Sequence, residues 1–410
     1  MDFRTGRRTA IAVTAALTAG ALLGAAPATP AAPVAATAPT PTILQTGLPA
    51  RSFSDPTGVN DNGVVVGYAY GSGQGNDTSA IRWNPDLTPT TLPPLSGEDF
   101  AQALGVNDAN LAIGISWPAS RDRYRATAVR WAADGTPTVL PPLPGDQYSK
   151  PTAIGSGGAV VGVSGNGAVE HAVAWRPDGT VVALAPLPGG TRSEAVDING
   201  AGVAIGRSST GSGTYRGVIW SSTGTPTPFQ TGPTGGAGDV PVQINDAGTV
   251  IGWADRPQST GTVRHGLVRS PNGAILDLGA NTLPVAINGS GTVVGQHQPN
   301  PTSSQTSAAK WSPTGTLTPL PLAASSGAKS TAVGINDSGT AIGYSWDGIP
   351  ARQYQAGKIW AADGTLTDLD PTGTTNTTLF INNTGLVVGL SLFRSAGSLY
   401  PSHLATVWRP

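Results

Sequence analysis

Cysteine is missing from this chain of 410 residues, so no disulfide can support the fold and the hydrophobic core must suffice. A chain of this length can bury such a core. Charge is scarce as well, because Asp, Glu, Lys and Arg together make up 11% of the residues and the net charge is −1. A nearly neutral chain is not expected to bind polyanions, so we expect no nucleic-acid partner.

Recognisable catalytic signatures are also missing. The sequence contains no nucleophile elbow, no phosphate-binding loop and no dinucleotide-binding fingerprint. Its four histidines are scattered along the chain without the spacing of metal ligands, at His171, His265, His297 and His403. We therefore expect no zinc site and no bound organic cofactor.

Residues 1–28 have the pattern of an export signal. Its positive end is supplied by three arginines: Arg4, Arg7 and Arg8. An uncharged apolar stretch covers residues 10–26, and Ala26-Pro27-Ala28 fits a small-x-small cleavage site. That stretch is short and rich in Gly and Ala, so no membrane span is expected after cleavage. The Arg pair leaves a twin-arginine signal open beside an ordinary secretory one. Residues 29–40 predict an Ala/Pro/Thr-rich linker, and we expect the mature protein to be secreted and extracellular.

The chain is organised around an internal repeat. The segment AVDINGAGVAIG at 195–206 predicts a strand, a tight turn and a second strand, because apolar residues alternate on both sides of the turn. The same pattern occurs eight times, with turns that start at residues 60, 107, 155, 199, 245, 288, 336 and 382. A period of about 46 residues is typical of repeat architectures.

Three slots of the repeat recur for physical reasons. The residue before the turn is Val or Ile in every copy, which suits a packed strand face. The third residue after the turn start is Gly, or Asn110 in the second copy, so this slot is expected to need a positive φ. The seventh residue is always Gly, which indicates a close approach by another group. We expect that group to be a recurring tryptophan.

Each turn is followed, 20 to 26 residues later, by a short apolar run that ends in Trp in seven copies. These residues are Trp83, Trp131, Trp175, Trp220, Trp311, Trp360 and Trp408. Arg269 takes the place of Trp in the fifth copy. One Trp at a fixed position of every unit favours a core between repeats over sugar stacking. A second turn, often Asp-Gly, and a fourth apolar run complete a unit of four up-and-down strands.

The two ends of the chain predict how the repeats close. The last copy stops at Pro410 without a fourth strand, whereas residues 41–44 match the fourth strand at 137–140. We therefore predict that residues 41–410 form one all-β domain, an eight-bladed β-propeller of four-stranded antiparallel blades. The N-terminal strand would complete the last blade. The alternative is an open β-solenoid, which leaves the interleaved ends unexplained.

The repeat resembles the HAF-type extracellular repeat. The similar residues are Leu184–Gly190, Ser193, Ala195, Ile198-Asn199, Gly202-Val203, Gly206 and His171–Trp175. They correspond to that family's D-L-G-T-L-G-G, S-x-A-x-x-I-N-x-x-G, V-V-G and H-A-F-x-W elements. The match is degenerate, since Pro-Pro or Ala-Pro stands in place of Gly-Thr and His opens the Trp strand only at His171 and His265. The resemblance implies a secreted repeat protein and no particular reaction.

Two connections in each unit vary in length and sequence, those between the second and third strands and those that lead to the next unit. In an up-and-down blade both lie on one face, which is where a rigid scaffold usually carries its binding site. Aromatic and arginine residues, the types that dominate binding hot spots, occur in these loops. The candidate binding residues are Trp117, Arg123, Tyr124, Tyr215, Trp253, Arg256, Trp346, Arg352 and Tyr354.

Acidic residues occur in the loops that enter the first five units. We expect an acidic arc at the channel mouth, formed by Asp99, Asp146, Glu194 and Asp239. Calcium is the candidate cation for this arc, and a solvated acidic rim is the alternative. Asp residues also follow the turn Asn directly in four copies, at Asp61, Asp108, Asp246 and Asp337. We expect those side chains to bond turn backbone and not calcium.

Two classes of function stay open. We favour a secreted, monomeric binding or scaffold module that recognises a protein or a cell-wall or other extracellular glycan through the variable loops. The alternative is an extracellular enzyme, a polysaccharide hydrolase or lyase with its site at the channel mouth. A quinone-dependent dehydrogenase has no sequence feature that requires it. The binding module is favoured because no carboxylate pair or histidine constellation recurs at catalytic spacing.

Overall fold

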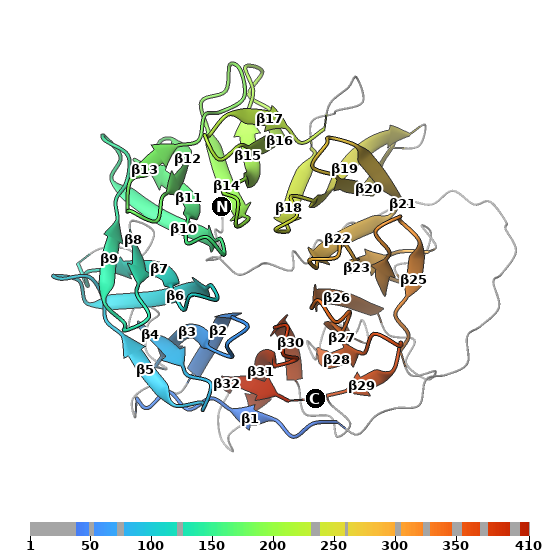
Figure 1. The fold of residues 1–410 in the computed structure, drawn as a ribbon, viewed down its shortest axis with the longest axis horizontal. Helices are drawn as coiled ribbons and strands as arrows, with labels where there is room; N and C mark the ends of the chain where they lie inside the picture. Colours follow the sequence, from blue (N-terminus) through green and yellow to red (C-terminus); the bar gives the residue numbers. More distant parts are fainter. Residues whose placement is uncertain are drawn as a thin grey trace, which may run out of the picture.

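The computed structural model describes residues 38–48, 53–71, 78–120, 126–230, 238–258, 261–299, 305–322, 329–346, 355–369, 376–393 and 402–409. The described strands form eight four-stranded sheets, which stand as blades around a central axis (Figure 1). Within a blade, successive strands pair in antiparallel fashion from the centre outwards. The chain is therefore an eight-bladed β-propeller. No described helix is long and apolar enough to cross a membrane.

The strands of the first four blades, each from the inner to the outer strand, have the following bounds: β2 Phe53–Val59, β3 Val65–Tyr70, β4 Thr78–Trp83 and β5 Pro89–Leu92; β6 Phe100–Val106, β7 Ala112–Trp117, β8 Thr127–Trp131 and β9 Pro137–Leu140; β10 Tyr148–Ile154, β11 Val160–Gly165, β12 Glu170–Trp175 and β13 Val181–Ala183; β14 Ser193–Ile198, β15 Ala204–Ser209, β16 Tyr215–Trp220 and β17 Pro226–Pro228. Those of the last four blades are: β18 Val240–Ile244, β19 Val250–Gln258, β20 Gly261–Arg269 and β21 Ile275–Ala280; β22 Thr282–Ile287, β23 Val293–His297, β24 Ser307–Trp311 and β25 Leu317–Pro319; β26 Lys329–Ile335, β27 Ala341–Trp346, β28 Ala356–Trp360 and β29 Leu366–Asp368; β30 Asn376–Ile381, β31 Val387–Phe393, β32 Ser402–Trp408 and β1 Thr42–Ile43.

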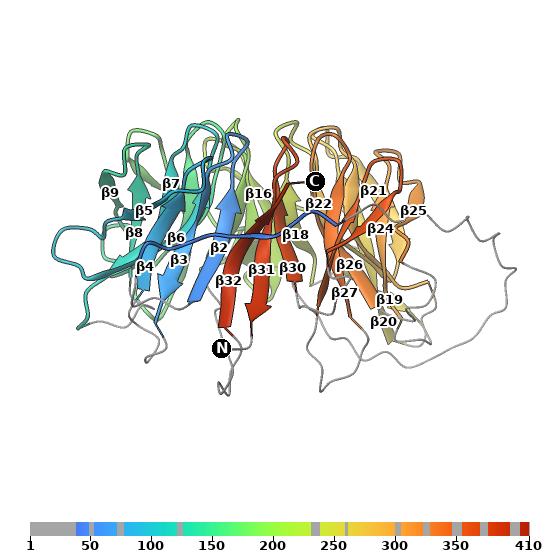
Figure 2. The ribbon, with the colours of Figure 1, turned by 90° about the horizontal axis from the view of Figure 1, so that it is seen from below.

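The predicted closure is confirmed. Strand β1 pairs with β32 with Thr42 opposite Val407, and the Leu44 N–H donates to the carbonyl of Ala405 at 2.8 Å. Figure 2 shows β1 crossing the outer side of the last blade, so the first and last segments of the chain share one sheet. Because β1 pairs with β32, the edge of β32 is covered where the two ends of the chain meet. An open solenoid would leave such a sheet edge exposed.

The tryptophan series forms the core between blades, as predicted. All seven side chains are completely buried. The indole N–H of Trp131 donates to the Pro93 carbonyl of the preceding blade at 2.7 Å, and Trp175 bonds Pro141 in the same way. Trp83, Trp220 and Trp360 make the same kind of bond, whereas the indole N–H groups of Trp311 and Trp408 have no partner among the described residues. All seven rings contribute apolar burial between neighbouring blades, and five of them add a hydrogen bond.

The invariant glycine of the repeat has a different cause from the one expected. The first strand of every blade carries a β-bulge at the same place, for example between Ala195 and Asp197. The bulge aims one carbonyl at the glycine, so that a Cβ on Gly206 would lie 2.0 Å from the Glu194 oxygen. The same carbonyl lies 1.9–2.3 Å from such a Cβ in all eight blades, whereas a Trp ring is among the three nearest atoms only at Gly114 and Gly206.

The turn asparagines connect the blades into a ring. Asn60 donates through Nδ2 to the Asn107 carbonyl of the next blade at 2.8 Å, and Asn382 closes the ring onto the Asn60 carbonyl at 2.8 Å. The expected positive φ is confirmed at the third residue after the turn start, from 59° at Asn110 to 88° at Gly385. The third blade interrupts the ring, because Gly155 has no side chain to donate.

The acidic residues after these asparagines bond backbone, but on a neighbouring turn. Asp108 accepts the Asp61 N–H through Oδ1 at 2.8 Å, and Asp337 accepts the Gly289 N–H at 2.7 Å. The expectation that these side chains bond turn backbone is therefore confirmed. The partner is the adjacent blade, since the turns stand side by side around the channel.

Candidate functional site

The two faces of the propeller differ. One face, here called the turn face, carries the asparagine ring and the short turns between the third and fourth strands. The opposite face, here called the variable face, is where β2 begins at Phe53, β3 ends at Tyr70 and the longer connections leave the blades (Figure 2). Of the candidate residues, Arg123, Tyr124, Arg352 and Tyr354 lie outside the described residues, as does the export signal.

Trp117 is not available for binding, which corrects the expectation for this residue. Its side chain is completely buried at the end of β7 and packs with Leu104, Ile115 and Ala126. The ring of Phe100 covers it, with ring centroids 5.9 Å apart. The sequence suggested an exposed loop aromatic because Trp117 directly precedes a variable connection. In the folded protein its side chain packs in the hydrophobic core instead.

The described candidates on the variable face lie in separate groups. Tyr215 is exposed, at 42% of its surface, and the Arg207 guanidinium lies 5.9 Å from its ring centroid. Trp253 is half-buried, with the Arg264 guanidinium stacked 3.7 Å from its ring. Trp346 is half-buried beside Tyr344 in the seventh blade. These groups belong to different blades.

The fifth blade carries a larger charged group on its extended hairpin, β19 and β20. Arg256 pairs with Asp277 at 2.6 Å, and His265 approaches the same carboxylate through Nδ1 at 3.0 Å. Arg264 adds a bond to Asp255 at 3.0 Å. The guanidinium of Arg264 is therefore held by a carboxylate while its face covers Trp253, a cation–π arrangement.

The four acids of the predicted arc each have a partner of their own. Asp99 accepts the Ala119 N–H at 2.7 Å, and Glu194 pairs with Arg207, whose Nε lies 2.6 Å away. Asp146 bonds Ser164, and Asp239 accepts the Gly217 N–H at 3.2 Å. Among the described residues, no group of three His, Cys, Asp or Glu side chains lies close enough to hold a metal ion. The structure thus distributes these acids over four local networks.

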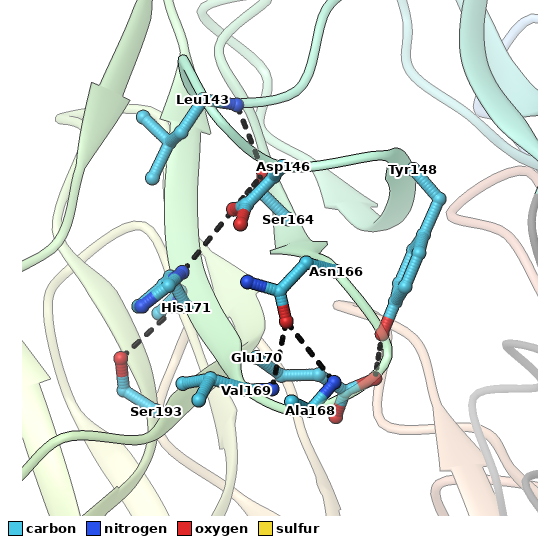
Figure 3. A network of polar contacts seen from close by, with 11 residues as sticks. Leu143, Asp146, Tyr148, Ser164, Asn166, Ala168, Val169, Glu170, His171 and Ser193 are labelled. Carbon is cyan, nitrogen blue, oxygen red and sulfur yellow. Dashed lines mark hydrogen bonds and ion pairs between the residues drawn. The ribbon is translucent and has the colours of Figure 1, made fainter.

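The third blade holds the network around Asp146. Figure 3 shows Asp146 between Ser164 and His171: the serine hydroxyl donates to Oδ2 at 2.6 Å, and Nδ1 of His171 lies 3.2 Å from the same oxygen. The Asp146 side chain is 5% exposed, whereas that of His171 is 40% exposed. A buried carboxylate that binds Nδ1 fixes the imidazole and leaves Nε2 toward solvent.

A second pair in the same blade occupies the row of residues next to this network. Tyr148 donates its hydroxyl to Glu170 at 3.0 Å across the three inner strands (Figure 3). Gly165 stands between them in the register, and a Cβ there would lie 2.6 Å from the Tyr148 hydroxyl. The glycine therefore lets the ring lie flat across the sheet.

The closing seam carries an aromatic group. Phe53 stacks on Tyr70 with ring centroids 5.3 Å apart, and the Tyr70 hydroxyl meets Nε2 of His403 at 2.6 Å. The same nitrogen lies 3.4 Å from Asp55. His403 belongs to β32 and the other three residues to the first blade, so this group joins the two ends of the ring. The remaining histidine, His297, is half-buried in the sixth blade, and burial lowers its pKa.

A buried polar group lies between the fourth and fifth blades. The carboxyl of Asp239 is completely buried, and burial raises its pKa against the opposing effects of the Gly217 N–H and Arg216. The Arg216 guanidinium approaches Asp239 at 3.7 Å and donates to the Gln230 carbonyl at 3.3 Å. Sequence reasoning missed Arg216 and Gln230, because neither stands in a recognisable motif.

The pairing of His171 with Asp146 was also not predicted from the sequence. The only signal in the sequence was that His171 and His265 occupy the same slot, four residues before the Trp position. Both imidazoles meet an Asp through Nδ1, but the two acids come from different elements, the loop before β10 and strand β21. Residue spacing could not reveal pairs that are built differently in each blade.

The comparisons with known proteins support the fold. No protein-family model and no curated protein sequence matches the chain. Among solved structures it is similar to Porphyromonas gingivalis dipeptidyl peptidase 4, with a TM-score of 0.55 and 13% identity over 87% of this chain and 59% of that one. It is also similar to the β-propeller domain of the Trilobed protease from Pyrococcus furiosus, with a TM-score of 0.50 and 8% identity over 87% of this chain and 95% of that one.

A third similar structure is a puromycin-hydrolyzing peptidase of Mycobacterium tuberculosis, with a TM-score of 0.50 and 13% identity over 88% of this chain. This chain spans only 62% of that peptidase and 59% of the Porphyromonas enzyme. At such identities the likeness shows the propeller fold alone. The Pyrococcus domain is described as having an open velcro topology, whereas β1 and β32 close the ring here.

Proposed function

We propose that this protein is a secreted binding or scaffold module that holds a protein or an extracellular glycan on its variable face. Export by the N-terminal signal and a monomeric state are parts of this proposal. Support comes from the asymmetry of the two faces. The turn face repeats one turn and one hydrogen-bonded ring, whereas the variable face presents a different polar or aromatic group in almost every blade.

The chemistry of the variable face suits a ligand that is partly polar and partly apolar. Tyr215 offers an exposed ring, and Trp253 a ring backed by Arg264. Carboxylates and arginines stand close to these rings in the fourth and fifth blades. Aromatic rings surrounded by groups that fix orientation are what binding sites on rigid scaffolds usually contain.

The experiment is a capture assay with the mature protein on beads, offered cell-surface extract and, separately, an array of glycans. Tyr215→Ala and Trp253→Ala, on the variable face, should each reduce retention at least tenfold. Asp178→Asn, in an exposed turn on the opposite face, is the matched control and should retain the ligand. Equal retention by all three variants would show that the variable face is not the binding surface.

The alternative function, an extracellular polysaccharide hydrolase or lyase, draws on two polar pairs in the third blade. Asp146 orients His171 with Nε2 toward solvent, which is the arrangement of a general base. Tyr148 and Glu170 supply a second acid–base pair in the same blade. Release of reducing or unsaturated ends from polysaccharides would support this function if His171→Gln abolished it and Tyr215→Ala reduced only substrate affinity.

A further inference from the structure

The strand that closes the propeller is held differently from the fourth strands of the other blades. In those blades the fourth strand follows the third through a turn, whereas β1 comes from the opposite end of the chain. It pairs with β32 at two positions, while β5 pairs with β4 at four. A short strand without a covalent turn beside it can detach by local unfolding, because only its own contacts retain it. Residues 41–48, which contain β1, are here called the strap.

The strap runs along the outer side of the ring from the last blade to the first (Figure 2). Leu44 is completely buried in a hydrophobic cluster that also contains Trp83 of the first blade. The Trp83 indole N–H donates to the Gln45 carbonyl at 2.7 Å, and a Cβ on Gly47 would lie 3.2 Å from the Cγ atom of Pro89. The strap therefore contacts the first blade as well as β32.

A strained residue of the first blade packs against the same cluster. Leu87 has a φ of 67°, and among the described residues every other non-glycine residue with a positive φ is an asparagine. A side chain disfavours this left-handed conformation, because its Cβ crowds the following carbonyl oxygen. Leu87 is half-buried, and its side chain lies against the cluster that holds Leu44. A strained backbone persists where surrounding contacts compensate for its cost.

The turn between β4 and β5 does not itself require leucine. The Leu87 N–H donates to the Asn84 carbonyl at 2.8 Å, just as the Gly135 N–H donates to the Ala132 carbonyl at 2.9 Å in the second blade. Glycine fills this slot, with a positive φ, in the six other blades that have the turn, at positions 135, 179, 224, 273, 315 and 364. The first blade therefore carries leucine where glycine would avoid the strain.

The other blades show what a side chain in this slot meets. A Cβ on Gly135 would lie 3.9 Å from Leu92, and a Cβ on Gly224 would lie 3.6 Å from Leu184. Both leucines belong to the preceding blade, at or directly after the end of its fourth strand. The corresponding residue of the last blade, which precedes the first, is Leu44 of the strap. The slot in the first blade is thus placed to cover the one fourth strand that no turn tethers.

We propose that Leu87 is a clasp that keeps the strap docked and so keeps the ring closed. Its apolar contact with the cluster around Leu44 exists only while the strap is docked. Detachment of the strap exposes Leu87 and leaves its strained backbone without compensation. The clasp is a conformational device of the scaffold, and it acts independently of any ligand on the variable face.

The test compares full-length mature variants by hydrogen-exchange mass spectrometry and by thermal unfolding. Leu87→Gly gives the turn the residue of the other blades and removes the contact. We expect the amides of residues 41–48, among them the Leu44 N–H that bonds the Ala405 carbonyl, to exchange about tenfold faster, because the strap detaches more often. Residues 137–140, which form the fourth strand of the second blade, should exchange as in the wild type.

Two further variants separate the contact from the backbone strain. Leu87→Ala removes the contact but keeps a Cβ in the left-handed conformation, so it should speed exchange of the strap as Leu87→Gly does and melt at a lower temperature than that variant. Gly179→Leu is the matched control, since it places leucine in the same turn of the third blade, where no described atom lies within 4 Å of the added Cβ. It should lower the melting temperature without speeding exchange of the strap.

Three outcomes would overturn the clasp. Unchanged exchange of the strap in Leu87→Gly would mean that the leucine does not retain it. Equal acceleration in residues 41–48 and 137–140 would indicate a loss of overall stability and no specific contact. Faster exchange of the strap in Gly179→Leu would show that the strap responds to strain in any blade.

Discussion

The ring of Phe229 stands over Gly252, where a Cβ would lie 2.9 Å from its Cζ atom. In the second and fourth blades a tryptophan ring occupies this place, at 2.7 Å over Gly114 and 2.9 Å over Gly206. The fifth blade has no such tryptophan, because Arg269 replaces it. Phe229 belongs to the preceding blade and directly follows β17, at a position where every other blade has Leu. Phe229 of the fourth blade thus fills the space over Gly252 that a tryptophan at position 269 of the fifth blade would otherwise occupy.

This exchange predicts unequal effects of truncation. Phe229→Ala should lower the free energy of unfolding by about 3–5 kcal/mol, as should Trp175→Ala, because each removes a completely buried ring. Arg269→Ala should cost about 1 kcal/mol or less, since this half-buried side chain is not the main filler of its slot. Denaturant unfolding measures all three. Equal losses at Trp175 and Arg269 would contradict the assignment of the core.

A double-mutant cycle tests the coupling directly. Arg269→Trp alone should destabilise the protein, because the new ring competes with Phe229 for one space. Phe229→Leu alone should leave a cavity. Together the two changes recreate the arrangement of the other blades, so the double variant should be more stable than the sum of the single effects implies. Strict additivity would show that the two residues do not share the space.

Closure of the ring should be required for stability. Deletion of residues 29–48 removes β1, the completely buried Leu44 and the Gln45 carbonyl that accepts the Trp83 indole N–H at 2.7 Å. We expect a lower melting temperature and aggregation, because β32 becomes an open edge. Deletion of residues 29–37 alone is the control and should change neither property. A shortened chain that stays monomeric and melts like the wild type would rule out the shared blade.

The hydrogen-bonded ring of turn asparagines is interrupted at Gly155, and we expect that an asparagine introduced there would destabilise the protein and not complete the ring. Asn288→Ala removes the donor to the Asn336 carbonyl at 3.0 Å and the acceptor for Thr292, a loss of about 1–3 kcal/mol. Gly155→Asn should destabilise as well, because a Cβ there would lie 2.7 Å from the Asn199 carbonyl oxygen. Gly105→Ala is the control, since its Cβ meets only Ile113 at an ordinary 3.6 Å. If Gly155→Asn raised the free energy of unfolding, the close approach of the Asn199 carbonyl would not be the reason for the glycine, and the prediction would be wrong.

Asp239 should make stability depend on pH. Burial raises the pKa of this carboxyl in the folded state above its unfolded value of about 3.9. The folded state therefore binds the proton more tightly, and stability contributed by the protonated form is lost as the pH rises through the folded pKa. Asp239→Asn should remove this dependence while Asn keeps an acceptor for Gly217. Unfolding free energies at a series of pH values measure it, and parallel curves for both proteins would contradict the prediction.

The unit of the fold could be predicted because its signals lie within one repeat. The turn that starts at Asn199, the positive φ of Gly202 and the alternating strands around them depend on residues a few positions apart. The pairing of β1 with β32 was predictable as well, since the missing and the spare strand stand at the two ends of the sequence.

The candidate site was harder to predict, because its contacts cross from one blade to the next. Nothing in the spacing of Asp239 indicates Arg216 or Gln230, and nothing around Trp117 distinguishes a buried ring from a loop aromatic. The carbonyl that requires Gly206 becomes visible only once the bulge in β14 is formed. The sequence alone therefore determined the number of blades, their strand order and their closure, through local periodicity and turn chemistry. Only the tertiary structure decided which side chains meet between blades, because those partners are set by packing across the repeat and not by distance along the chain.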